Sequence, residues 1–195
     1  MRGAYFCVMT VRRTASSPLA AGLLATGLLA AGLAAAAVTG AAPAAAAPAA
    51  GGHTVTGPAP VPAPDFDLAA GDVCAFGVHG TYPVNRQQGW TTTDASGRTV
   101  AEYVQGTLTG VFTNTATGRS VTRDLSGQGL STYAADGSSV FTGHGPALVG
   151  FHAGDRPAHQ LLVFGSRGVE QVRFAADGRR TLVVGAGEDL CRTLA

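Results

Sequence analysis

The stretch T-N-T-A-T-G-R-S, residues 113–120, decides the fold that we expect for this chain. It places a Gly-Arg pair between two segments rich in threonine and valine. A similar motif, glycine followed by Arg or Ser, recurs in D-A-S-G-R (94–98), A-D-G-S (135–138) and A-D-G-R (176–179). Glycine supplies the positive φ that a tight hairpin turn requires, and an Asp or Thr before it can bond back to the turn backbone. Each stretch therefore predicts a turn between two antiparallel strands.

The same alternation continues over the whole chain from Val73 onward. Short runs rich in valine, threonine, phenylalanine and tyrosine are separated by glycine-bearing breaks about ten residues apart, which is typical of short strands joined by tight turns. The pattern predicts an all-β domain, an antiparallel meander of about 8–10 short strands. Regular breaks without long crossovers indicate consecutive hairpins, so we favour a closed barrel or curled sheet over a two-sheet sandwich.

Hydrophobic periodicity assigns faces to several of these strands. In 108–112 the even-numbered positions share one face, and in 169–174 the even-numbered positions do the same. The continuous apolar runs 161–164 and 182–184 predict strands that are buried on both faces or lie at the centre of a sheet. The acidic start of E-D-L-C-R-T-L (188–194) predicts a short C-terminal helix, because carboxylates suit a helix N-terminus.

The N-terminal region predicts export. Arg2, Arg12 and Arg13 precede an uncharged run over 19–38, and alanine- and proline-rich sequence with small-residue cleavage sites follows. This arrangement is typical of a secretory signal peptide, which we place at residues 1–47. A retained membrane anchor is the alternative. Cleavage would leave a secreted protein without a stable membrane anchor.

Residues 48–65 predict a linker rather than part of the core. Prolines at positions 58, 60, 62 and 64 favour an extended, polyproline-like tether. We therefore expect the β-rich domain to occupy residues 66–195, which is enough chain for one hydrophobic core.

The cysteines agree with an oxidising compartment. Cys7 precedes the apolar run of the predicted signal peptide, which leaves Cys74 and Cys191 as the pair in the mature chain. Exported domains commonly form disulfides, so we predict a Cys74–Cys191 bond, with two buried free thiols as the alternative.

The charge pattern argues against nucleic acid as a partner. All thirteen basic residues are arginines, and from Gly51 onward ten arginines stand against twelve acidic residues. The charges are scattered singly, without the basic stripe of a nucleic-acid site or the polybasic cluster of a membrane-attached segment.

Glu102 and Arg123 are the first candidate site. Each is flanked two residues away by apolar positions, so both could face an interior and grip a polar ligand between them. We expect their strands to flank strand 108–112. The alternative is that Thr99, Ala101 and Tyr103 face inward instead and leave Glu102 in solvent.

A second candidate lies in a histidine-containing segment. His144, His152, Asp155 and His159 fall within sixteen residues, and these residue types bind zinc and other divalent ions. Their spacing matches no known ligand pattern, and turn positions explain them as well. We predict no metal and no cofactor, and keep the four as weak candidates.

Aromatic residues are the third candidate. Tyr82, Trp90, Tyr103 and Tyr133 could form a stacking platform for sugars or a hydrophobic ligand, although core packing is the alternative role. Because Trp90 follows the polar sequence Gln87-Gln88-Gly89, we expect it to be partly exposed and include it among the ligand-binding candidates.

The chain resembles a group of small secreted actinobacterial proteins. The resemblance rests on D-F-D-L-A-A-G-D-V-C-A-F (65–76), T-N-T-A-T-G-R-S, A-D-G-S and the terminal D-L-C-R-T-L (189–194). That group shares a signal peptide and a C-terminal cysteine. It has no assigned activity, so the resemblance implies export and a β-rich domain and transfers no site residue.

No catalytic motif is present, and we therefore expect an exported, non-catalytic β-domain that binds a small ligand or a cell-envelope component. One alternative is a secreted enzyme of unknown class with a site near Glu102 and Arg123 or in the segment 144–159. The other is a structural envelope protein.

Overall fold

The computed structural model describes residues 52–195, which lie in one compact unit. The predicted signal peptide 1–47, Cys7 and the first residues of the predicted linker lie outside the described residues. In the described part of the chain, no helix combines the length and hydrophobicity needed to cross a bilayer.

Residues 52–195 form fourteen β-strands and one short helix. In chain order these are β1 (Thr54–Pro60), β2 (Phe66–Leu68), β3 (Val78–Asn85), β4 (Gln88–Thr93), β5 (Thr99–Gly106), β6 (Leu108–Asn114), β7 (Ser120–Asp124), β8 (Gly127–Tyr133), β9 (Ser139–His144), β10 (Leu148–Phe151), β11 (Gln160–Phe164), β12 (Val169–Phe174), β13 (Arg180–Val184), β14 (Gly187–Asp189) and α1 (Leu190–Thr193).

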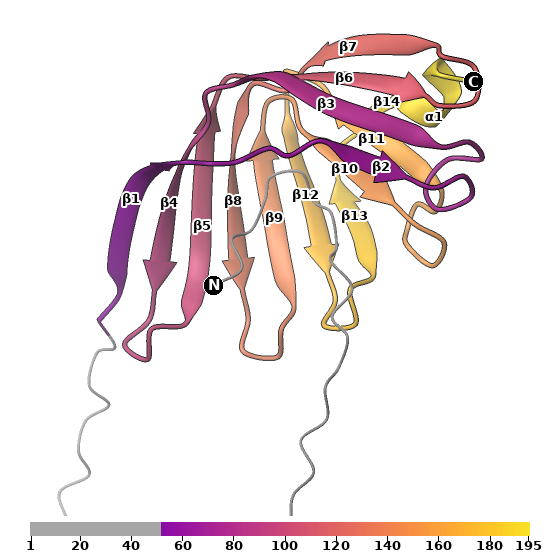
Figure 1. Ribbon diagram of the computed structural model, residues 1–195. Coiled ribbons are helices and arrows are strands. Elements are labelled where there is room, and N and C mark those ends of the chain that lie inside the picture. Colours follow the sequence, from indigo (N-terminus) through magenta and orange to yellow (C-terminus); the bar gives the residue numbers. More distant parts are fainter. Residues whose placement is uncertain (1–51) are drawn as a thin grey trace, which may run out of the picture. The chain divides into compact units, whose positions relative to one another are not determined.

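Consecutive strands behave as the two halves of longer, bent strands. Strand β5 ends at Gly106 and β6 begins at Leu108, yet β5 pairs with β4 whereas β6 pairs with β3. The same exchange of partners occurs along the chain, so the fourteen strands form seven consecutive bent pairs, from β1–β2 to β13–β14 (Figure 1). All of the strand pairings are antiparallel.

One half of each bent pair lies in a seven-stranded sheet, in the order β1-β4-β5-β8-β9-β12-β13. The other halves divide into a four-stranded sheet, β2-β3-β6-β7, and a three-stranded sheet, β10-β11-β14. The absence of pairing between β7 and β10 separates the four-stranded from the three-stranded sheet, and the edge strands β1 and β13 of the seven-stranded sheet do not pair with each other, so the described strands do not close into a barrel. The fold is the predicted all-β antiparallel curled sheet with a short C-terminal helix, but with more strands than predicted, because the bends divide the long strands.

The four glycine-centred turns are confirmed. Each joins two neighbouring strands of one sheet and has a glycine at positive φ between +75° and +90°: Gly97, Gly118, Gly137 and Gly178. In each turn a side-chain oxygen accepts a backbone N–H two residues further on: Asp94, Asn114, Asp136 and Asp177. Local chemistry thus sets these hairpins, as expected for Asx turns.

The hydrophobic core has two parts. The first lies between the four-stranded and three-stranded sheets and the helix: Phe66, Val73, Cys74, Val78, Leu108, Phe112, Leu125, Leu148, Leu161, Val163, Leu190 and Leu194. The second packs the three-stranded sheet against β9, β12 and β13: Phe141, Ala147, Val149, Phe151, Leu162, Phe164 and Val172, with Phe174 and Leu182 at its margin. The predicted faces of 108–112 and 169–174, and the buried run 161–164, are confirmed.

Two predictions about the apolar and proline-rich segments are wrong. The run 182–184 belongs to β13 at the edge of the seven-stranded sheet, where Val183 and Val184 are 45% and 51% exposed. The predicted linker contains β1, which pairs with β4. Prolines fit this strand because it too is an edge strand, where a missing N–H can face solvent.

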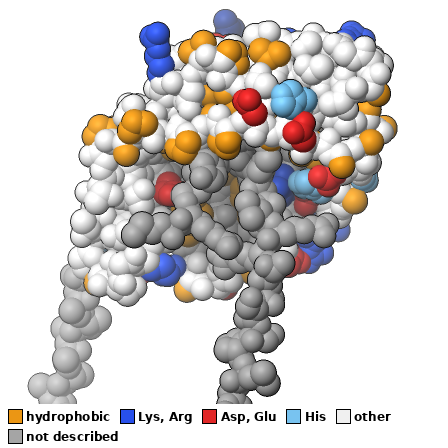
Figure 2. All heavy atoms as spheres, in the orientation of Figure 1, with side chains coloured by type: hydrophobic (Ala, Val, Ile, Leu, Met, Phe, Trp, Pro, Cys, Tyr) orange, Lys and Arg blue, Asp and Glu red, His pale blue; other side chains and the backbone are white. Residues whose placement is uncertain are grey.

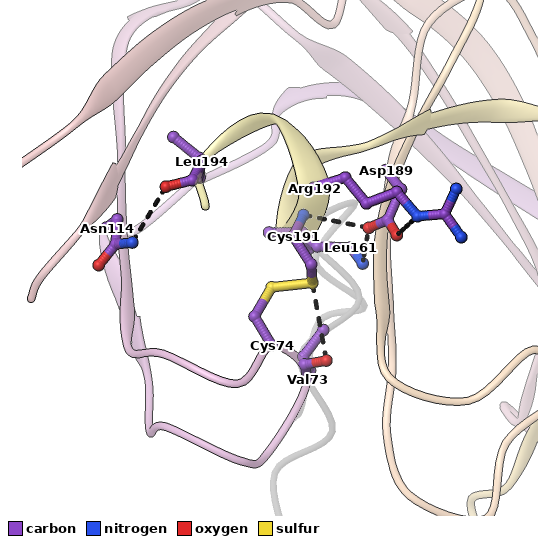
Figure 3. The surroundings of a disulfide bond; sticks show 8 residues. All are labelled: Val73, Cys74, Asn114, Leu161, Asp189, Cys191, Arg192 and Leu194. Atoms are coloured by element: carbon purple, nitrogen blue, oxygen red, sulfur yellow. Dashed lines mark hydrogen bonds and ion pairs between the residues drawn. A yellow bond between two sulfur atoms is a disulfide. The ribbon is translucent and has the colours of Figure 1, made fainter. Parts of the chain in front are cut away.

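The predicted disulfide is confirmed. Cys74 lies in the loop between β2 and β3 rather than on a strand, and Cys191 lies in α1, with the two Cα atoms 5.2 Å apart (Figure 3). Asp189 caps the helix by accepting a hydrogen bond from the Cys191 N–H at 3.0 Å. The bond therefore joins the first part of the four-stranded sheet to the last element of the chain.

Asn114 makes a second connection to the C-terminus. Its side chain is buried, accepts the Ala116 N–H at 2.9 Å within the β6–β7 turn, and donates through Nδ2 to the Leu194 carbonyl oxygen at 3.0 Å (Figure 3). One residue therefore orders a turn and holds the chain end.

Replacing Asn114 by alanine should lower the free energy of unfolding by about 1–3 kcal/mol, because it leaves a buried carbonyl and turn N–H groups without partners. Urea denaturation measures the change. Asp94→Ala in the equivalent β4–β5 turn is the matched control, since it removes turn hydrogen bonds that have no link to the C-terminus. Equal losses in both variants would contradict a role for Asn114 in holding the chain end.

Candidate functional site

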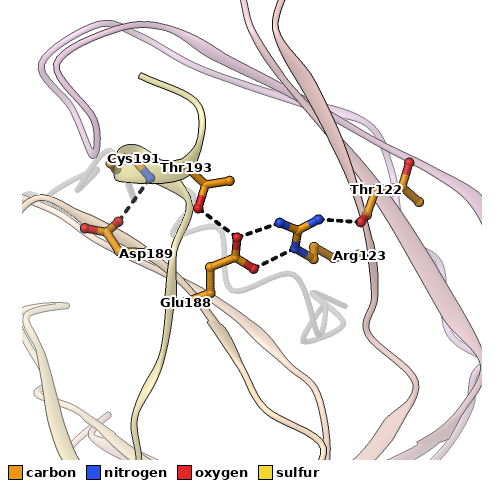
Figure 4. Close-up of polar contacts among 6 residues, drawn as sticks. All are labelled: Thr122, Arg123, Glu188, Asp189, Cys191 and Thr193. Atoms are coloured by element: carbon orange, nitrogen blue, oxygen red, sulfur yellow. Dashed lines mark hydrogen bonds and ion pairs between the residues drawn. The ribbon is translucent and has the colours of Figure 1, made fainter.

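Arg123 forms an ion pair that joins two sheets. From β7 its Nε and Nη2 donate to the Glu188 carboxylate of β14 at 2.6 and 2.5 Å, and its Nη1 donates to the Thr122 carbonyl oxygen (Figure 4). Thr193 donates to the same carboxylate at 2.7 Å. The hydrogen bond raises the pKa of Arg123 and lowers the pKa of Glu188. This guanidinium is occupied by a structural partner.

Glu102 lies elsewhere and has another partner. From β5 it accepts a hydrogen bond from the Tyr133 hydroxyl at 2.5 Å. Burial, and then this hydrogen bond, raise the pKa of Tyr133 above that of a free phenol. Strand register places Glu102 in one row with Ser131 and Phe141, on the face that carries the second core.

Glu102 and Arg123 therefore do not form the shared site that the sequence predicted. The expectation that their strands flank β6 was wrong for β5, which pairs with β4 and β8 and continues into β6 through a bend. The sequence did not decide which face of β5 points inward. In the structure it is the face that carries Glu102 and the buried Val104.

The four candidate metal ligands are also not assembled. His152 contacts Asp72 through its ring Nδ1 at 2.7 Å. The buried Asp155 accepts the backbone N–H groups of His152 and Arg180, at 2.6 and 2.7 Å. Within residues 52–195 no group of three or more His, Cys, Asp or Glu side chains could hold a metal ion.

A row of polar side chains crosses the outer face of the seven-stranded sheet, the face opposite Glu102. Strand register aligns Gln88 of β4, Gln105 of β5, Gln128 of β8 and His144 of β9. Because side chains in register on neighbouring antiparallel strands project from the same face, these four lie side by side.

The row lines a shallow groove where the strands bend. The groove has a volume of about 510 Å³, and its remaining lining comes from Arg86, Gly106 and Gly127. Among the described residues, no acidic side chain lines it. Arg86, an exposed residue, adds a positive charge to this lining.

Two aromatic rings stand beside the groove on the same face. Trp90 and Tyr103 occupy the next row on β4 and β5, and their ring centroids are 5.6 Å apart with a 45° angle between the planes. Both are partly exposed, as predicted for Trp90. The other two candidate aromatics have packing roles: Tyr82 contacts Phe66 and Phe112, and Tyr133 bonds Glu102.

Tyr103 orients two of the amides. Its hydroxyl lies 3.0 Å from Oε1 of Gln105 and 2.8 Å from Oε1 of Gln128. The hydroxyl has a single hydrogen, so the two amide oxygens compete for it. The groove therefore presents amide groups that can both donate and accept hydrogen bonds.

Sequence reasoning missed these glutamines, although a signal is present. Each is followed by glycine, in Gln88-Gly89, Gln105-Gly106 and Gln128-Gly129. Gly106 and Gly129 were interpreted only as breaks between strands, and Gln88-Gly89 only as polar sequence before Trp90. The pairs are far apart in the chain, and only the strand register brings their amides into one row.

Charged side chains cover little of the visible face of the described residues. Figure 2 shows acidic side chains beside histidines on one side of this face and separate basic side chains elsewhere, with large areas of other side chains and backbone between them. Comparisons with models of known protein families, with curated proteins and with solved structures find no match to this chain.

Proposed function

We propose that this chain is an exported, non-catalytic β-domain that binds a small polar ligand, or an exposed part of a cell-envelope component, in the groove on the outer face of its seven-stranded sheet. The observation that carries the proposal is the alignment of Gln88, Gln105, Gln128 and His144 in one row beside an aromatic pair. Binding sites characteristically combine aromatic surface with a few placed polar groups.

The lining of the groove supports binding rather than catalysis. Amide side chains donate and accept hydrogen bonds but do not exchange protons near neutral pH. Within residues 52–195 no carboxylate lines the groove, so this part of the chain offers His144 no acidic partner there to orient it as a general base. The alternative enzyme sites are weakened because Arg123 and Asp155 are engaged by other groups of the chain.

Export is part of the proposal. The basic and apolar N-terminal sequence predicts a signal peptide. A disulfide is compatible with an oxidising compartment outside the cytoplasm, and the chain forms one between Cys74 and Cys191.

Trp90 provides a direct test because it is the single tryptophan of the chain. We expect that titration with a panel of polar compounds, comprising mono- and oligosaccharides, polyols, amino acids and nucleotides, will identify a class that shifts Trp90 emission. The same compounds should move the side-chain NH₂ resonances of Gln105 and Gln128 in ¹⁵N spectra. We expect both signals to respond to the same compounds because Gln105 and Gln128 lie on the same face of the sheet as Trp90.

The matched control observes a distant amide. Gln171 lies on β12 of the same sheet and donates to Thr142, so its NH₂ resonance should stay unchanged. If no class in the panel affects Trp90 or the groove amides at millimolar concentration, the proposed function is wrong.

A further inference from the structure

We infer that the ligand of the groove is an acidic saccharide, a short chain of pyranose rings that carries a carboxylate or phosphate. This inference rests on the proposed function and adds the ligand class. It follows from three features of the groove: an aromatic pair, a row of neutral amides, and one positive charge without an acidic side chain among the described residues that line the groove.

The aromatic pair fits one face of a sugar ring. A pyranose carries C–H groups on its faces and hydroxyl groups around its edge. Partly exposed aromatic rings with polar groups close by suit such an amphipathic ligand. Trp90 and Tyr103 offer two tilted rings in contact, on a face where Leu130, 41% exposed, extends the apolar surface in the same row.

The amide row fits the edge of the same ring. Gln88 and Gln105 lie two residues along their strands from Trp90 and Tyr103, a separation of about 6.6 Å. A pyranose about 5 Å across that stacks on the aromatic pair would thus bring its hydroxyl oxygens to the amides. The amides of Gln105 and Gln128 donate through NH₂ and accept through their oxygens, and sugar hydroxyls can pair with either group.

Arg86 selects for negative charge. A guanidinium binds carboxylate or phosphate through two parallel hydrogen bonds. Among residues 52–195, no acidic side chain lines the groove to neutralise it. Arg86 lies in the connection before β4, four residues from Trp90, so the two Cα atoms are at most about 14 Å apart. A ligand that reaches both would contain about two or three pyranose rings.

A nucleic acid fits this surface poorly. Its backbone carries one charge per nucleotide and is bound through several arginines or lysines. The groove offers Arg86 and the imidazole of His144 among neutral amides. One anionic group on a largely uncharged, hydroxyl-rich ligand matches that balance better.

Calorimetric titration of the full folded chain tests the inference with three compounds: maltotriose, a maltotriose whose terminal non-reducing glucose is replaced by glucuronate, and glucose 6-phosphate. We expect the mono-uronate to bind about 2–5-fold more tightly than maltotriose at low salt, because one exposed ion pair contributes up to about 1 kcal/mol. The difference should shrink as salt screens the pair. Binding of glucose 6-phosphate at the groove would indicate that phosphate replaces carboxylate.

Variants separate the contributions of the groove residues. Arg86→Gln should remove the preference for the charged trisaccharide and leave maltotriose binding unchanged. Gln128→Ala and Trp90→Ala should weaken binding of both, and Gln128→Ala serves if the tryptophan variant does not fold, since Gln128 is exposed. Arg173→Gln, an exposed arginine on β12 of the same sheet, is the matched control and should bind as wild type.

The outcomes distinguish this inference from the proposed function. If amino acids or nucleotides bind at Trp90 while none of the saccharides does, the inference is overturned and the groove remains a binding site. Equal affinities for the mono-uronate and for maltotriose overturn the acidic specificity. Failure of every class of compound overturns both.

Discussion

Replacing Cys74 and Cys191 together by alanine is expected to lower the free energy of unfolding by about 4–5 kcal/mol. The bond closes a loop with a sequence separation of 117 residues, so its loss restores much conformational freedom to the unfolded chain. Alanine is preferred to serine because Cys74 is buried and a hydroxyl there would need a new partner. Urea denaturation of both proteins measures the loss.

The position of the bond is the second reason for a large effect. The four-stranded and three-stranded sheets share no strand pairing and are held together through the first core, the Arg123–Glu188 ion pair and this disulfide. Cys74 follows β2 at one edge of the first sheet, and Cys191 follows β14 at one edge of the second. The bond therefore fixes one sheet against the other.

Reduction of the wild type is the matched control for the double variant. Dithiothreitol should bring the denaturation midpoint of the wild-type protein down toward that of the variant, and should not move the midpoint of the variant. A wild type whose midpoint is unaffected by complete reduction would contradict the prediction.

The hairpin turns could be predicted because their cause is local. A glycine at positive φ and an Asp or Asn side chain that bonds two residues ahead are both readable in a short stretch such as 113–120. The disulfide followed from counting the cysteines. Faces of strands with one buried side, such as β6, followed from their period of two.

The bends could not be predicted because a bend and a turn share the same signal. Gly106 marks the bend between β5 and β6. The chain does not reverse there as it would in a hairpin turn, but the strand that pairs with it changes from β4 to β3. Which partner a strand pairs with is a non-local property. For this reason the strand count was too low and Glu102 was expected near Arg123.

The residues of the groove could be predicted only in part, because strand pairing is not readable from the local sequence. Trp90 was recognisable from its polar neighbours, although one of them, Gln87, is buried. The alignment of Gln88 with Gln105 and Gln128 depends on register across three strands, and the repeated Gln-Gly pairs indicate it only once that register is known.

Glu170 is expected to make the protein less stable as the pH rises. Its side chain is 3% exposed on β12, and within residues 52–195 its Oε1 has no hydrogen-bond partner. The carboxyl lies over Gly143 and close to the ring of Phe141, and the side-chain stem lies beside Gly185. Burial in these surroundings raises its pKa from 4.5 to about 7.

The sign of the effect follows from proton uptake. Below pH 4.5 this carboxyl is protonated in both the folded and the unfolded chain and has no effect on their balance. Between pH 4.5 and about 7 the unfolded chain releases the proton while the folded chain retains it, so stability falls by about 1.4 kcal/mol per pH unit. The total loss is about 3 kcal/mol, and it levels off above pH 7.

Glu170→Gln removes this titration, so the difference in unfolding free energy between variant and wild type should shift by about 3 kcal/mol in favour of the variant from pH 4 to pH 8. Glu170→Met tests the same point without burying an amide. Glu188→Gln is the control of opposite sign, because Arg123 lowers the pKa of Glu188 and the wild-type carboxylate therefore stabilises the fold at neutral pH. Urea denaturation at several pH values measures each difference, and a Glu170 difference that stays constant between pH 4 and pH 8 would mean that this carboxyl titrates normally in the folded protein.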